Sequence, residues 1–198
     1  MADQTPSIVA SMAITPSPFP ASGESKPNIT LTVTSHHSEP ITILTYTTIF
    51  NLEASLFRSN FTCRDISNPD DPKPMHIDYT HGPRRPGFNR ESGGPDDQYF
   101  VTLEPMVPVT FTSLFWLQVT PWPEEEDEDG EEVEDIRIPA FLPGHTYQLG
   151  AKDNVVIRDW WVGRKDQIMS PPGQKANTKK SSGSPIAPAI EDLIFHTV

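Results

Sequence analysis

The stretch NITLTVTSHHSEPITILTYTTIF, Asn28 to Phe50, decides the fold class of this chain. Near its start, Ile29, Leu31 and Val33 alternate with polar residues, and this period of two predicts a β-strand with one apolar face. A short polar loop follows and leads into a second predicted strand. The large side chains of that strand change parity at Leu44, which indicates a β-bulge or a change in the face that is covered.

The rest of the chain continues in the same way, with short apolar or alternating segments separated by proline-rich and polar turns. No segment keeps an apolar i, i+3, i+4, i+7 pattern over three turns without proline, so helices are not expected. We therefore predict an all-β chain, an antiparallel β-sandwich of about seven to nine strands in one domain over residues 1–198. Besides the two strands in 28–50, the strand candidates are 7–14, 56–62, 75–79, 99–103, 107–119, 142–149, 154–162 and 191–198.

The composition predicts that much of this domain is loop. Its 198 residues include 22 prolines and 11 glycines, and proline is excluded from helix interiors and from central strands. Hydrophobic residues make up 35% of the chain and the mean hydropathy is -0.44, which is low for a compact domain. Flexible insertions are expected near residues 81–98, 124–135 and 170–188.

The negative charge is concentrated in one segment. The net charge is -12, but residues 124–135 hold 10 of the 27 acidic residues, which leaves 17 acids against 15 bases elsewhere, a balance of -2. Ten like charges cannot share a core, so we expect this segment to be a solvated loop. No basic stripe is present to pair with phosphates, and nucleic acid is therefore not an expected partner.

Membrane and export signals are weak in this sequence. No run approaches 18 apolar residues, and the first twenty residues contain Asp3 and no basic segment, so neither a membrane span nor a signal peptide is predicted. A single cysteine, Cys63, cannot form an internal disulfide. We expect a cytoplasmic protein.

The segment from Leu142 to Tyr147, with Pro143-Gly144 in its turn, resembles the tyrosine corner of immunoglobulin-like and fibronectin-type β-sandwiches. That resemblance implies that the Tyr147 hydroxyl bonds to nearby backbone. The strand–loop–strand unit of 28–50, and the segment from Val101 to Pro105 followed by an alternating strand, are also similar to the pro-domain of fungal deuterolysin-type metalloproteases. The HExxH zinc motif of those proteases is missing here, so the resemblance implies an immunoglobulin-like fold and no protease activity.

Tryptophans give the strongest candidate binding residues. Tryptophan gathers at binding surfaces because it combines a large apolar area with a polar N–H. In a strand over 154–162, two adjacent tryptophans would point to opposite faces, and we interpret one as core and the other as half exposed. The candidate binding residues are Trp116, Trp122, Trp160 and Trp161.

Catalytic and metal-binding candidates are fewer. Asp159, Arg158 and His145 are the candidate acid–base residues if the protein is an enzyme. The histidines lack the spacing of a metal site, so neither a metal nor a cofactor is predicted. Cys63 has no base nearby in the sequence, and a buried cysteine is the favoured interpretation.

Two functions remain open from the sequence. The first is a non-enzymatic interaction module that binds a protein or peptide through its edges and long loops. It is favoured because many segments predict strands of a β-sandwich and no recognisable set of catalytic residues accompanies them. The second is a small enzyme of specialised metabolism, a cyclase or isomerase, that holds an apolar organic ligand in an aromatic pocket beside an acid–base group. The sequence gives no sign of the oligomeric state.

Overall fold

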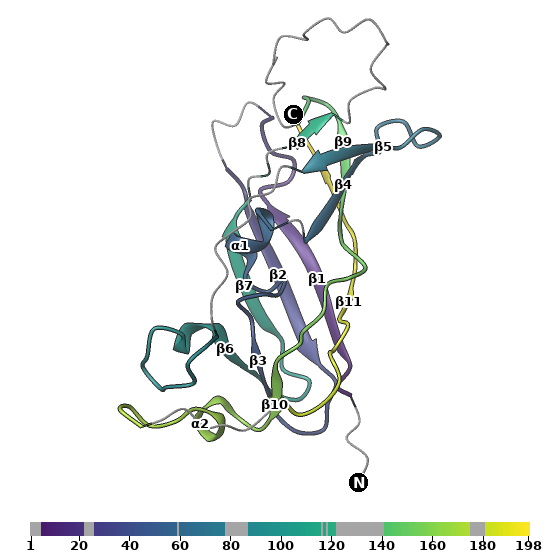
Figure 1. The fold of residues 1–198 in the computed structure, drawn as a ribbon. Helices are drawn as coiled ribbons and strands as arrows, with labels where there is room; N and C mark the ends of the chain where they lie inside the picture. The colour runs from purple at the N-terminus through teal and green to yellow at the C-terminus, as the bar shows by residue number, and fades with distance from the viewer. Residues whose placement is uncertain are drawn as a thin grey trace, which may run out of the picture.

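The structure is a computed structural model and describes residues 5–21, 26–58, 60–77, 87–115, 117, 119–121, 141–174 and 181–198. Strands account for 41% of it and helices for 8%, so the predicted all-β class is confirmed. Two short helices and a 3-10 turn lie between strands (Figure 1). None of the helices among these residues is long and apolar enough to cross a membrane.

The elements follow one another as a series of short strands. In chain order they are β1 (Ile8–Thr15), β2 (Asn28–Ser35), β3 (Ile41–Leu44), α1 (Leu52–Leu56), β4 (Phe61–Asp65), β5 (Lys73–Ile77), η1 (Asp97–Tyr99), β6 (Phe100–Leu103), β7 (Val109–Leu114), β8 (Val119–Pro121), β9 (Thr146–Ala151), β10 (Trp160–Val162), α2 (Lys165–Ile168), β11 (Ala189–Ile190) and β12 (Leu193–His196).

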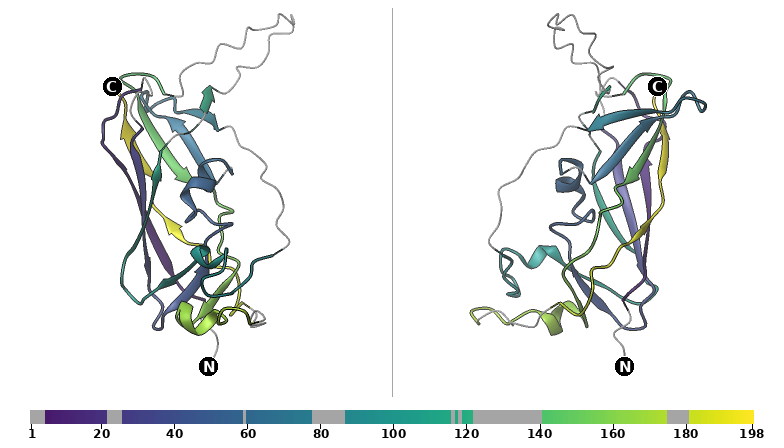
Figure 2. Two further views of the ribbon diagram at one scale, coloured as in Figure 1. Left: turned by 90° about the vertical axis from the view of Figure 1, so that its left-hand side faces the viewer. Right: turned by 45° about the vertical axis from the view of Figure 1, so that its right-hand side comes forward.

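The described strands form three sheets. Their orders are β11-β1-β2-β7, β10-β3-β6 and β12-β9-β4-β5-β8. Every pair is antiparallel except β1 with β11. Figure 2 shows β10 and α2 at one end of the molecule and β5 and β8 at the other.

The first sheet has the alternation that the sequence predicts. Ile29, Leu31 and Val33 of β2 are fully buried, while the residues between them face outward. β1 alternates in the same way and pairs with β2 along its whole length. Strands with a period of two bury one face and leave the other to solvent, so this sheet has a distinct outer face.

Of the two explanations expected for the parity change at Leu44, a β-bulge or a change in the covered face, the structure has the change in the covered face. β3 ends at Leu44, and a turn leads into α1. β3 is buried on both faces: Ile41 and Ile43 join the main core, whereas Leu44 joins a second apolar cluster. The strand expected at 56–62 is also shifted, because α1 takes its start and β4 begins only at Phe61.

The sheets share one large apolar core. It combines residues of the first sheet, such as Leu31, with residues of the five-stranded sheet, such as Leu149 and Phe195. Phe195 lies within ring contact of Phe19, Phe115, Phe141 and Tyr147. Aromatic side chains bury large areas, so this group ties the C-terminal strand to the loops around it.

Some expectations fall on residues outside the described set. These are the acidic segment 124–135, residues 81–86 of the expected insertion at 81–98, and residues 175–180 of the expected insertion at 170–188. In the described remainder of that last segment, Ile186 is buried and pairs its backbone with Ile157.

Candidate functional site

Both tryptophans of β10 are buried, in two different clusters. Trp160 is 1% exposed in the main core, and its Nε1 donates a hydrogen bond to the Ser184 carbonyl at 3.0 Å. Trp161 is 5% exposed and packs beside Phe100 in the second cluster. The two side chains do point to opposite faces, but a second cluster covers the face that the sequence analysis left half exposed.

Arg90 completes the surroundings of Trp161. Its guanidinium lies 4.9 Å from the centre of one Trp161 ring, a cation–π geometry. The residue is 9% exposed, and its Nη1 has no hydrogen-bond partner among the described residues. Burial lowers the pKa of Arg90, and the charge of Asp159 opposes that shift. The cluster is therefore a packed structural unit with one unsatisfied donor.

The other candidate residues do not come together. Arg158 and Asp159 are exposed, next to the buried Trp160. His145 lies at the start of β9, where its Nδ1 is 2.6 Å from Asp65 Oδ2. Trp116 and Trp122 lie outside the described residues.

His145 takes part in a network of hydrogen bonds between the end of β4 and the start of β9. Ser67 donates its hydroxyl to Asp65 at 2.6 Å, and that same hydroxyl oxygen accepts the N–H of Thr146 at 2.9 Å. Burial alone would raise the pKa of Asp65, but the hydrogen bonds from Ser67 and His145 outweigh it and lower the pKa. Asp65 thus accepts from both neighbours and holds the turn before β9 to the end of β4.

Cys63 lies on the inward face of β4 and is 2% exposed. Burial, reinforced by the nearby charge of Asp65, raises the pKa of the thiol to about 12. The thiolate is the nucleophilic form of cysteine, so at neutral pH this side chain is an inert part of the core.

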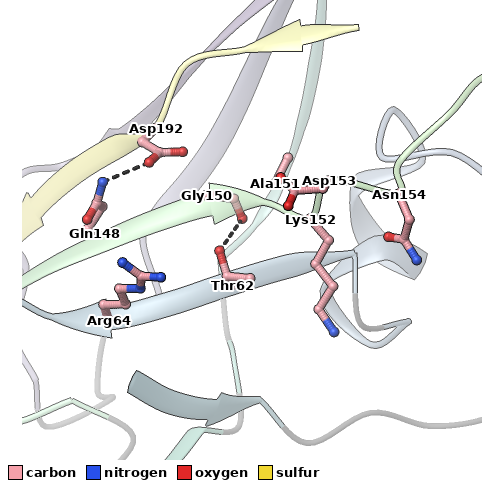
Figure 3. A pocket seen from close by; sticks show the side chains of 9 residues that line it. All are labelled: Thr62, Arg64, Gln148, Gly150, Ala151, Lys152, Asp153, Asn154 and Asp192. Atoms are coloured by element: carbon pink, nitrogen blue, oxygen red, sulfur yellow. Dashed lines mark hydrogen bonds between the residues drawn. The ribbon is translucent and has the colours of Figure 1, made fainter. Parts of the chain in front are cut away.

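A polar groove of about 500 Å³ crosses the outer face of β4 and β9 (Figure 3). Gln148 Nε2 donates to Asp192 Oδ2 at 2.7 Å on one side of it. Gly150 makes this possible, because a Cβ at that position would lie 2.7 Å from Asp192 Oδ1. The groove is lined by two cations (Arg64, Lys152), two carboxylates (Asp153, Asp192) and two amides (Gln148, Asn154).

The groove differs from the aromatic pocket that the enzyme alternative requires. No aromatic side chain of the described residues lines it, and the two positive and two negative charges of its described lining balance. His145 and Asp159 are not among its lining residues either. Apolar organic ligands bind in mostly apolar pockets with a few polar groups, so this groove does not fit one.

The free edge of β7 is the most unusual feature of the described surface. Phe115 donates its N–H to Pro27 of the neighbouring chain segment, which fixes the direction of the backbone groups along β7. By alternation, the N–H and C=O groups of Thr110, Thr112 and Leu114 point away from β2. β2 is the one strand that pairs with β7, and these outward groups make no backbone hydrogen bond within the described residues.

Natural proteins protect such edges with charges, prolines or bulges. β7 has none of these between Val109 and Leu114, and its register with β2 is unbroken. No charged residue occurs anywhere between Glu104 and Glu124. The helix α1 lies beside β7, where Phe50 stacks on the inward ring of Phe111 at 5.7 Å.

The outer face of the same sheet is also uncharged. Thr30 of β2 lies opposite Thr112 of β7, with their hydroxyl oxygens 3.5 Å apart. The outward residues of the three long strands are Val9, Ser11, Ala13, Thr15, Asn28, Thr30, Thr32, Thr34, Thr110, Thr112 and Leu114. Solvated faces normally carry charge, so a hydroxyl-rich neutral face that runs up to an open edge is typical of an interaction surface.

Exposed apolar side chains gather at the ends of β7. Leu114 is 54% exposed, and Met106 and Val107 in the turn before the strand are 61% and 52% exposed. Met106 also has a φ of 60°, a conformation that costs a non-glycine residue free energy. Backbone strain is often kept where it positions a side chain for function.

The sequence pattern points to tryptophans as binding residues and does not single out β7. One signal was available: the charge-free interval between Glu104 and Glu124 coincides with the longest apolar strand candidate. That interval alone could not show that β7 lies at an edge, since a neutral strand is equally at home in the middle of a sheet.

No family model matches the sequence, and no curated protein matches it.

Proposed function

We propose that this chain is an immunoglobulin-like sandwich. The order β1-β2-β7 corresponds to strands A-B-E of that fold, and β12-β9-β4 corresponds to G-F-C. Tyr147, near the start of the strand in position F, is fully buried, and its hydroxyl oxygen accepts the N–H of Leu142 at 2.9 Å. Strand order and tyrosine corner support the same assignment independently. In it, β3, β6 and β10 are an addition to the sandwich.

The proposed function is binding of an extended protein segment by β-strand addition at the edge of β7. In this mode a partner strand pairs with an exposed sheet edge, and the main-chain hydrogen bonds supply much of the affinity. The observation that carries the proposal is the row of outward backbone groups on Thr110, Thr112 and Leu114. Met106 and Leu114 then offer apolar contacts to the side chains of the partner.

The chemistry of the edge favours a polypeptide over other ligands. Alternating N–H and C=O groups match the backbone of another strand, and the absence of positive charge along β7 gives phosphate groups nothing to bind. The interaction-module interpretation is therefore favoured over the enzyme interpretation, whose candidate residues lie apart.

A proline scan of the edge tests this function. The probe is a displayed library of short extended peptides, selected against the wild-type protein. Thr112→Pro removes one outward N–H without breaking the ladder to β2, whereas Thr112→Val keeps that N–H and changes only the side chain. We expect Thr112→Val to retain the selected peptides and Thr112→Pro to lose them.

Thr110→Pro repeats the test at a second outward position, and thermal unfolding shows whether each variant is folded. Failure to select any peptide, or equal binding by wild type and both folded proline variants, would overturn the assignment of β7 as the binding edge.

A further inference from the structure

We propose that one occupant of the β7 edge is the β7 strand of a second copy of this chain. This inference rests on the proposed function and names a partner for it. Two copies related by a two-fold axis would pair β7 with β7 in antiparallel fashion, which joins two four-stranded sheets into one.

The open backbone groups select the register of this pairing. Hydrogen-bonded pairs must join residues whose N–H and C=O point outward, and these are Thr110, Thr112 and Leu114. With Thr112 on the two-fold axis, Thr112 faces its own copy and Thr110 faces Leu114 of the other molecule. All three outward residues of each strand are then paired, so no edge group between Thr110 and Leu114 stays open.

The side chains of β7 fit this register on both faces. On the inner face, Phe111 of one copy falls opposite Ser113 of the other, a large side chain beside a small one. On the outer face, Thr112 falls opposite Thr112. The same hydroxyl pair already exists within the molecule, where Thr30 and Thr112 lie opposite each other in the β2–β7 ladder.

Charge is the reason to prefer a second copy. In this two-fold pairing Thr112 on the axis meets a copy of itself, so a charged residue at that position would face a like charge. β7 and the outward residues of β1 and β2 carry no charge at all, so self-pairing places no like charges together. The strand lacks the charged residue that would prevent self-association.

The net charge predicts how this dimer responds to salt. Each copy carries -12, so the two molecules repel each other at long range. Added salt screens that repulsion and strengthens the dimer, whereas binding of a basic partner would weaken under the same change. A pairing of six residues is a small interface, so we expect a weak dimer in exchange with monomer.

A charge-swap experiment on the two-fold axis tests the proposal. Sedimentation equilibrium of the full chain, between about 1 µM and about 1 mM, measures the dissociation constant. Thr112→Lys places two like charges opposite each other and should weaken the dimer by about threefold to tenfold, as should Thr112→Glu. An equimolar mixture of the two variants should restore association to the wild-type level or above it, because the lysine of one molecule then faces the glutamate of the other. Thr112→Val is the matched control and should dimerise like the wild type.

Two outcomes of this experiment would overturn self-pairing. A wild-type protein that stays monomeric over the whole range overturns self-pairing, while the peptide selection still decides the proposed function separately. A dimer that is equally strong in Thr112→Lys, or that the mixture fails to restore, places the contact elsewhere and also overturns the proposal. Thermal unfolding of each variant shows that any loss of association occurs in a folded protein.

Discussion

The Tyr147 hydroxyl oxygen accepts a hydrogen bond from the backbone N–H of Leu142 at 2.9 Å, across the turn that leads into β9. Tyr147→Phe removes this bond while keeping the ring and its contacts, so we expect the free energy of unfolding to fall by about 1 kcal/mol. Urea unfolding measures the change. An unchanged midpoint with an unchanged slope would show that the hydrogen bond adds nothing to stability.

The raised pKa of Cys63 predicts that the folded protein loses stability at alkaline pH. Its folded pKa of about 12 lies above the ordinary value of 9.0, so the folded state favours the protonated thiol. That contribution is complete below about pH 9 and is lost as the pH rises toward about 12.

The control for this prediction is Cys63→Ala. We expect the alanine variant to be less stable near neutral pH, because it leaves a small cavity, and to have a flatter alkaline limb than the wild type. Unfolding curves measured at several pH values up to about 10 make the comparison. Parallel curves for the two proteins would contradict the assignment.

Two substitutions of Arg90 should have different effects on the free energy of unfolding. Its buried Nη1 has no partner among the described residues, and Arg90→Met removes that donor while filling similar space, so stability should stay within about 1 kcal/mol or rise. Arg90→Ala also removes the packing on Trp161 and should cost about 2 kcal/mol or more. Equal losses in both variants would mean that the positive charge itself stabilises the cluster.

Replacing Met106 by glycine should affect the stability of the protein and its binding of peptides in different ways. Its φ of 60° suits glycine, and its side chain is 61% exposed, so Met106→Gly should leave stability unchanged or raise it by up to about 1 kcal/mol. The same variant loses an apolar contact beside β7 and should bind the selected peptides more weakly. A large loss of stability would instead show that the Met106 side chain supports the turn.

The local pattern of the strands was predictable from sequence. Alternation at Ile29, Leu31 and Val33 places these side chains in the core because a strand with one covered face buries every second residue. The resemblance of Leu142 to Tyr147 to a tyrosine corner likewise implied the hydrogen bond of the Tyr147 hydroxyl. Both features depend on residues that are close together in the chain.

Features that depend on distant residues were not predictable. Trp161 is buried because Phe100 and Ile168 of α2 pack in the same cluster, and no local sequence pattern indicates this contact. The parity change at Leu44 was compatible with a bulge or with a change in the covered face, and the change of face depends on the second cluster, which is built from distant residues. β7 lies at the edge because of the order in which the strands pair across the sheet. That order depends on distant residues, and the uncharged sequence of β7 does not indicate it.

Residue-resolved amide hydrogen exchange of β7 in dilute solution measures whether the edge of this strand is open. An open edge predicts alternation: the amides of Phe111 and Ser113, which point to β2, should exchange at least about tenfold more slowly than those of Thr110 and Thr112. A bound peptide should then protect Thr110 and Thr112. Slow exchange at Thr112, equal to that at Phe111 in the isolated monomer, would show that the edge is already covered and would contradict the account.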